Sequence, residues 1–127
     1  MRKYAIINQP VFFNAFGNKT LLKKVMIYFD GSCTLLFHYE NTDECSGCSG
    51  DYWFENLEEA EDYALEEYNI KPTDWIEIDD PLPHCQHDVI RPFRIKGRDV
   101  GNPIWGELES FDGEKWVDFI YDKRGGY

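Results

Sequence analysis

Apolar, β-rich runs lie on either side of an Asp-Gly dipeptide at two places in the chain. The dipeptides are Asp30-Gly31 and Asp112-Gly113. The flanking runs are Leu21–Phe29, Ser32–Tyr39, Pro103–Phe111 and Glu114–Tyr121. Aspartate and glycine both tolerate positive φ, which a tight turn between antiparallel strands requires. The pattern therefore predicts two β-hairpins.

Residues Leu57–Tyr68 show the clearest helical spacing of apolar positions. Asn56 can cap the first turn, and Glu59, three residues later, completes a capping-box pattern. Asn69 suits the end of a helix, and Pro72 prevents its continuation. We therefore expect a helix that buries one face. The apolar residues of that face are Leu57, Ala60, Ala64, Leu65 and Tyr68.

The remaining segments divide into short strands and polar loops. We expect strands over Lys3–Asn8, Trp75–Ile78 and Val89–Lys96. We expect loops over Gln9–Lys19 and Asn41–Asp51, because each contains glycine and asparagine. Strands that follow one another along the chain favour antiparallel pairing. The order predicts an α+β fold, in which one main helix packs on one face of a largely antiparallel sheet.

Length and composition predict a folded, soluble protein. The 127 residues fit a single domain over 1–127, with 122–127 as a frayed tail. Hydrophobic residues make up 43% of the chain, which excludes an intrinsically disordered protein. No run of about 18 apolar residues is present, and the apolar part of the N-terminus is too short for a secretory signal. We therefore expect a cytoplasmic location and no membrane association.

The charge of the chain is strongly acidic and unevenly placed. Acidic residues number 24 against 13 basic residues, which gives a net charge of −11. Residues 40–80 hold 15 of the acidic residues and one basic residue, Lys71, so this segment carries −14. Such a charge argues against binding to nucleic acid or to anionic lipid. It indicates either an interaction surface for a basic protein partner or a well-solvated face that aids solubility.

One face of the expected helix is acidic, and the helix contains no lysine or arginine. Glu66 and Glu67, near its C-terminal end, oppose the helix dipole, so stability alone does not account for them. This face predicts a non-enzymatic protein-binding domain. A concrete form is an inhibitor or immunity-type protein that covers the cationic site of a nuclease-like toxin. The predicted partner-binding residues are Asp51, Trp53, Glu58, Glu59, Asp62 and Glu66.

Basic residues gather in one short stretch that contains Arg91, Arg94, Lys96 and Arg98. The last three alternate and so fall on one face of a strand. They can pair with the acidic segment, or they can bind an anion, because a guanidinium matches carboxylates and phosphates. No glycine-rich phosphate loop accompanies them, so we favour the ion pairs.

Cys45 and Cys48 have the spacing of a zinc knuckle, in which two thiolates bind one ion. Cys85 and His87 are the candidates that complete a Cys₃His site, which makes a zinc-stabilised structural or regulatory module the alternative function. The competing interpretation is that these are loop thiols and a surface histidine without a metal. Cys85 and His87 are too close in sequence to form a thiolate–imidazole pair readily, and no other catalytic motif is present. We therefore expect no enzyme activity and no cofactor other than one structural zinc ion.

Overall fold

The computed structural model of the chain describes residues 1–15 and 18–119. Within these residues it contains one α-helix, α1 (Leu57–Tyr68), and eight strands, which confirms the α+β class. The tail expected over 122–127 lies outside the described residues. The strands are β1 (Arg2–Ala15), β2 (Asn18–Phe29), β3 (Thr34–Tyr39), β4 (Gly50–Phe54), β5 (Ile76–Ile78), β6 (Phe93–Ile95), β7 (Leu108–Phe111) and β8 (Trp116–Phe119).

The chain divides into two compact units. The first comprises Met1–Thr42 and Cys48–Asp79, and it holds α1 and a large sheet. The second comprises Asp43–Gly47 and the described residues from Asp80 onward, and it holds a smaller sheet. The single domain expected over 1–127 stays a prediction.

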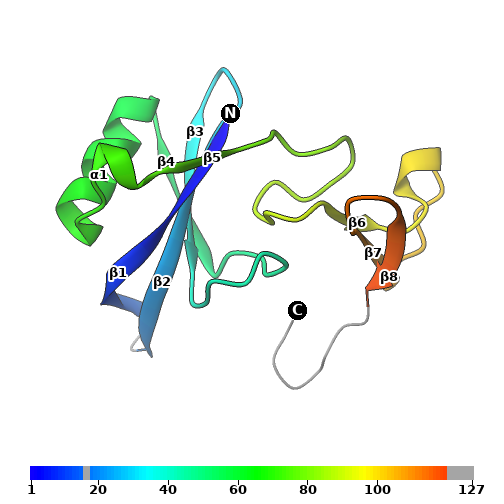
Figure 1. Ribbon diagram of the computed structural model, residues 1–127, viewed down its shortest axis with the longest axis horizontal. Helices are drawn as coiled ribbons and strands as arrows, with labels where there is room; N and C mark the ends of the chain where they lie inside the picture. The colour runs from blue at the N-terminus through cyan, green and yellow to red at the C-terminus, as the bar shows by residue number, and fades with distance from the viewer. Residues whose placement is uncertain (16–17, 120–127) are drawn as a thin grey trace. The chain divides into compact units, whose positions relative to one another are not determined.

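The first unit is built on a five-stranded antiparallel sheet in the order β4-β3-β2-β1-β5 (Figure 1). β1 pairs with β2 on both sides of a register shift between Ile6 and Val11. The loop expected over Gln9–Lys19 is therefore wrong, because β1 and β2 occupy most of that stretch. Pro10 lies inside the register shift, where a residue that cannot donate to the ladder is tolerated.

The turn between β2 and β3 is formed by residues 30–33. Asp30 Oδ1 accepts hydrogen bonds from the backbone N–H groups of Cys33 and Ser32, at 2.9 and 2.8 Å. These bonds favour the ionised carboxylate and hold the pKa of Asp30 well below its ordinary value. Gly31 has a φ of +100°, which residues with a side chain rarely adopt. The aspartate and the glycine thus both stabilise this turn.

β4 forms one edge of the large sheet and pairs with β3 over all five of its residues. The loop expected over Asn41–Asp51 is wrong at its end, because β4 begins at Gly50. Tyr52 and Phe54 are half-buried and lie against Tyr63 of α1, with ring centroids 5.6 and 5.3 Å apart. These aromatic contacts explain why a segment next to a polar loop forms a strand.

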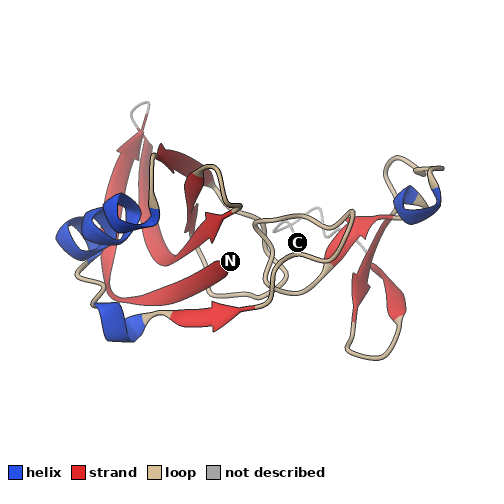
Figure 2. Cartoon of the chain, turned by 90° about the horizontal axis from the view of Figure 1, so that it is seen from above, coloured by secondary structure: helices blue, strands red, loops and turns tan. Residues whose placement is uncertain are grey.

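α1 packs on one face of the large sheet, and its bounds confirm the predicted helix (Figure 2). Asn56 Oδ1 accepts a hydrogen bond from the backbone N–H of Glu59 at 2.9 Å, and Asn69 ends the helix in the left-handed conformation. Leu65, which was expected in the core, is 43% exposed, because it lies about 100° around the helix from the buried Ala64. The buried core consists of Ala5, Ile7, Leu22, Val25, Ile27, Leu36, Ala60, Ala64, Tyr68 and Ile70.

The second unit contains a three-stranded antiparallel sheet in the order β6-β7-β8. The strand expected over Val89–Lys96 is limited to β6, because Pro92, which has no N–H for a ladder, directly precedes it. Asp112 Oδ1 accepts hydrogen bonds from the backbone N–H groups of Lys115 and Glu114 in the turn between β7 and β8. Among the helices of residues 1–15 and 18–119, none is long and apolar enough to cross a membrane.

Candidate protein-interaction surface

The outer side of α1 carries Glu58, Asp62 and Glu66, which we call the acidic surface. These residues are spaced four apart, so their side chains follow one another along the helix. All three are exposed. In the part of the chain that the structure describes, no lysine or arginine forms an ion pair with any of them. Like charges at this spacing repel one another, so the acidic surface lowers helix stability and favours an external cation.

Two other carboxylates of α1 are held by contacts within the first unit. Glu61 Oε1 accepts a hydrogen bond from Lys3 Nζ at 2.7 Å. Glu59 Oε2 accepts a hydrogen bond from the backbone N–H of Glu55 at 3.3 Å, beside the N-terminal cap. Glu59 was predicted to bind a partner, but it also helps to close the first turn. Its environment therefore differs from that of the acidic surface.

Leu65 lies among the carboxylates of α1. Asp62 and Glu61 precede it by three and four residues, and Glu58 precedes it by seven, so all three border it on the helix surface. An exposed leucine with charged neighbours resembles the apolar centre and polar rim of a protein interface. The sequence pattern assigned Leu65 to the core. Its position at the edge of the apolar arc was the signal that could have placed it outside.

Asp51 and Trp53 lie on the face of the large sheet opposite α1. Their neighbours Tyr52 and Phe54 contact Tyr63 of the helix, and side chains alternate between faces along a strand. Both residues are exposed, Trp53 to 61%. The structure therefore divides the six predicted partner-binding residues between two faces, with four on α1 and two on β4.

His38 of β3 joins a cluster of three tyrosines beneath α1. Its Nε2 shares a hydrogen bond of 2.5 Å with Oη of Tyr68, and its ring meets that of Tyr52 with centroids 4.8 Å apart. Tyr63 contacts the rings of both tyrosines. Burial lowers the pKa of His38 to about 4, against a smaller opposing effect of the Asp51 carboxylate. Burial also raises the pKa of Tyr68, so burial favours the neutral forms of both His38 and Tyr68. The cluster joins the last turn of α1 to the sheet.

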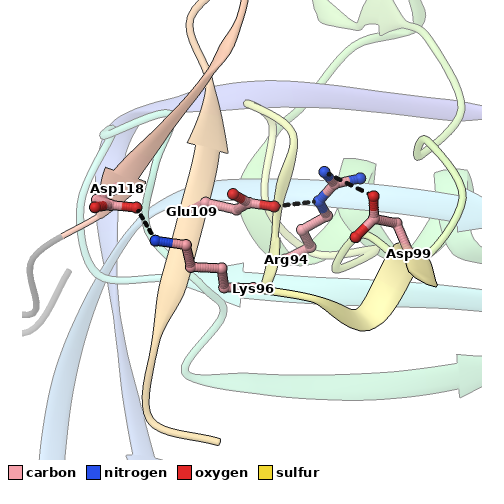
Figure 3. A network of polar contacts seen from close by, with 5 residues as sticks. All are labelled: Arg94, Lys96, Asp99, Glu109 and Asp118. Carbon is pink, nitrogen blue, oxygen red and sulfur yellow. Dashed lines mark hydrogen bonds and ion pairs between the residues drawn. The ribbon is translucent and has the colours of Figure 1, made fainter. Parts of the chain in front are cut away.

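Two basic residues of the second unit, Arg94 and Lys96, are paired within that unit (Figure 3). Arg94 Nε donates to Glu109 Oε1 at 2.7 Å, and Arg94 Nη2 lies 3.5 Å from Asp99 Oδ2. Lys96 Nζ donates to Asp118 Oδ1 at 2.8 Å. These acidic residues lie outside 40–80, so the expected pairing with that segment is wrong for both cations. Their charges are neutralised by neighbouring strands and loops.

Arg91, which lies outside the alternating set of three basic residues, does pair with the acidic segment. Its Nη2 lies 3.5 Å from Glu44 Oε2, and its backbone N–H donates to the Glu44 carbonyl at 3.0 Å. Both side chains are about half exposed, so the ion pair contributes little to stability. The backbone bond is the more specific contact within the second unit.

The predicted zinc ligands are distributed over both units. Cys45, Cys85 and His87 belong to the second unit, and Cys48 belongs to the first. Among the described residues, no three or more histidine, cysteine, aspartate or glutamate side chains are grouped so that they could hold a metal ion. Burial raises the pKa of the Cys45 thiol in the metal-free chain. Zinc binding stays a prediction, and native mass spectrometry of protein purified without chelator tests it through the presence or absence of one zinc mass per chain.

A pocket of about 180 Å³ opens in the first unit beside the C-terminal end of α1. Its lining includes Lys71 and Asp74, and Asp74 Oδ2 accepts a hydrogen bond from the Lys71 backbone N–H at 2.8 Å. This carboxylate therefore closes the short 3-10 turn Pro72–Asp74.

The expectation that the chain has no enzyme activity stays a prediction.

Comparisons with known proteins leave the surface of the first unit as the main guide to function. No protein family matches the chain, and no curated protein or solved structure is significantly similar to it.

Proposed function

We propose that the chain is a non-enzymatic, cytoplasmic protein-binding domain that recognises a basic protein through α1. The observation that carries the proposal is the acidic surface beside Leu65. Three exposed carboxylates without a cation partner among the described residues lie along α1, and two of them, Glu58 and Asp62, border Leu65, which is 43% exposed. Charge supplies attraction over a distance, and the leucine supplies apolar area at the centre of the contact.

The contrast with other charged groups of the chain supports this proposal. Lys3 pairs with Glu61, Arg94 with Glu109, and Lys96 with Asp118, and each of these pairs has an N–O distance of 2.7 or 2.8 Å. The acidic surface lacks such a pair in the described part of the chain. Its charge is therefore available to an incoming protein.

The C-terminal turn of α1 supports the same conclusion from energetics. This turn contains no basic residue, although a cation there would interact favourably with the helix dipole. Glu66 and Glu67 instead place negative charge at the negative end of the dipole. A helix optimised for stability alone would carry lysine or arginine at such positions, so we infer that the carboxylates serve binding.

An inhibitor or immunity-type protein is the concrete form of this function. A nuclease presents a cationic site to its phosphate substrate, and a helix with aligned carboxylates is electrostatically complementary to such a site. Opposite charges on the two proteins accelerate their encounter, and this acceleration falls with ionic strength.

The test uses three matched forms of the chain as bait for proteins from its native host. The wild type is compared with the variant Glu58→Lys/Asp62→Lys/Glu66→Lys and with the control Glu40→Lys/Glu107→Lys/Glu114→Lys. The control changes the net charge equally at exposed residues outside α1. We expect one basic protein to bind the wild type and the control at low salt and to be lost from the acidic-surface variant.

Two outcomes contradict the proposal. Equal retention of the partner by both variants would assign binding to net charge or to another surface. Absence of any basic protein from the wild-type bait, under conditions in which circular dichroism shows it folded, would remove the basis for a basic partner. Inhibition of a captured nuclease by the wild type alone would establish the inhibitor form.

A further inference from the structure

We infer that the edge of β4, which among the described residues pairs with β3 alone, accepts an extended basic segment of the partner as an added strand. This inference rests on the proposed function and specifies how a second part of the same partner is held. It also gives a role to Asp51 and Trp53, which the fold places on the opposite face of the sheet from α1. An added strand alternates its side chains between the two faces and so reaches both sets of residues.

β4 is suited to strand addition because it is an edge strand and its pairing with β3 is regular. It is the last strand in the order β4-β3-β2-β1-β5, and it pairs with β3 over five consecutive residues without a register shift. The other edge strand, β5, has only three residues, and Pro81 and Pro83 follow it closely. Short strands and nearby prolines protect a sheet edge from added strands, so β5 is the better protected of the two.

Carboxylates and an aromatic ring line β4 on the face covered by α1. The helix runs back along the strand, because Glu59 bonds to Glu55 at the strand end and Tyr63 contacts Phe54 and Tyr52 in turn. Glu59 and Glu67 therefore lie one turn before and one turn after Tyr63. Burial is the main cause of the raised pKa of Tyr52, and the charge of Glu67 adds to it. Basic side chains that point to this face meet negative charge.

The opposite face of β4 offers a different pair of contacts for basic side chains. Asp51 supplies a carboxylate, and Trp53, which is 61% exposed, supplies an indole ring two residues further along the strand. A guanidinium or ammonium group stacks favourably on such a ring. Both faces of the edge therefore favour cations, and the open backbone favours an extended chain. A second copy of this acidic chain would meet repulsion on both faces.

The test uses a synthetic peptide as the probe. The parent peptide places pairs of arginines between single valines over about seven residues, the length of an ordinary strand, so that arginines point to both faces. The control peptide has the same side chains but is N-methylated at two adjacent central residues, which blocks both of its hydrogen-bonding edges. Titrations of ¹⁵N-labelled protein measure affinity, and hydrogen exchange measures protection of the β4 amides. We expect the parent peptide to slow exchange in β4, and the control peptide to bind about tenfold more weakly because hydrogen bonds are lost.

Protein variants locate the contact. Asp51→Lys and Trp53→Ser change exposed side chains, so we expect both variants to remain folded. Each should lower the affinity for the parent peptide several-fold. Glu77→Lys makes the same charge change on the other edge strand, β5, and is expected to leave the affinity unchanged. Equal binding of the two peptides, equal weakening by Asp51→Lys and Glu77→Lys, or absence of peptide binding would each overturn strand addition. Failure of the proposed function is seen separately, as a native partner that is insensitive to the acidic-surface variant.

Discussion

His38 Nε2 and Tyr68 Oη lie 2.5 Å apart and join β3 to the last turn of α1. The bond crosses the interface between the sheet and the helix and is surrounded by the rings of Tyr52 and Tyr63. A buried polar pair of this kind orients the helix, because displacement would break the hydrogen bond between the two groups in a dry environment. The orientation of α1, and with it of the acidic surface, therefore depends on this contact.

The stability of the first unit should depend on pH through His38. Burial lowers its folded-state pKa from 6.5 to about 4, so the unfolded chain binds a proton more readily. The contribution of His38 is fully present above about pH 6.5 and decreases as the pH falls towards 4. Urea unfolding across this range should show a smaller pH dependence for His38→Gln, which cannot titrate, than for the wild type. Parallel pH profiles for the two proteins would contradict this role.

The N-terminal cap of α1 gives a prediction about helix stability. Asn56→Ala removes the acceptor of the Glu59 N–H bond and should lower the free energy of unfolding by about 1 kcal/mol. Asn56→Asp keeps an acceptor in place and serves as the control. Urea denaturation followed by circular dichroism measures both. Unchanged stability in the alanine variant would show that the cap is not used in solution.

Much of the helix could be predicted from sequence, whereas parts of the sheet could not. Asn56 and Asn69 define the helix ends through local hydrogen bonds, and a local pattern is sufficient to recognise them. The continuation of β1 past Pro10 depends on pairing with β2, which no window around the proline contains. Helical spacing predicted that the acidic residues of α1 share one face. The position of Trp53, on the sheet face opposite α1, could be predicted only by knowing that β4 forms and which of its residues point to each face.

The ion pairs of Arg94 should matter more than the exposed pairs of the chain. Its side chain is 12% exposed, contacts Glu109 at 2.7 Å, and lies over the ring of Trp116 at 3.6 Å. Arg94→Met leaves the carboxylate of Glu109 buried without this cation and should cost about 3 kcal/mol. The double variant Arg94→Met/Glu109→Leu removes both charges and should recover much of that loss. Chemical denaturation measures both variants, and a double variant no more stable than the single one would contradict the account.

The C-terminal end of α1 should show a trade-off between stability and binding. Glu66→Lys places a cation at the end of the helix and four residues after Asp62, so it should raise the free energy of unfolding by about 0.5 kcal/mol. The same change should weaken binding of the basic partner. Glu66→Gln, which removes the charge without reversing it, should be intermediate in both measurements. A variant that becomes less stable, or that binds the partner more tightly, would argue against a binding role for this residue.

Association kinetics of the captured partner test the central claim most directly. The acidic-surface variant Glu58→Lys/Asp62→Lys/Glu66→Lys should associate about tenfold or more slowly than the wild type at low salt, and the difference should shrink near 0.3 M salt. The charge-matched control Glu40→Lys/Glu107→Lys/Glu114→Lys should stay close to the wild type. An association rate that is the same for both variants at low salt would contradict recognition through α1.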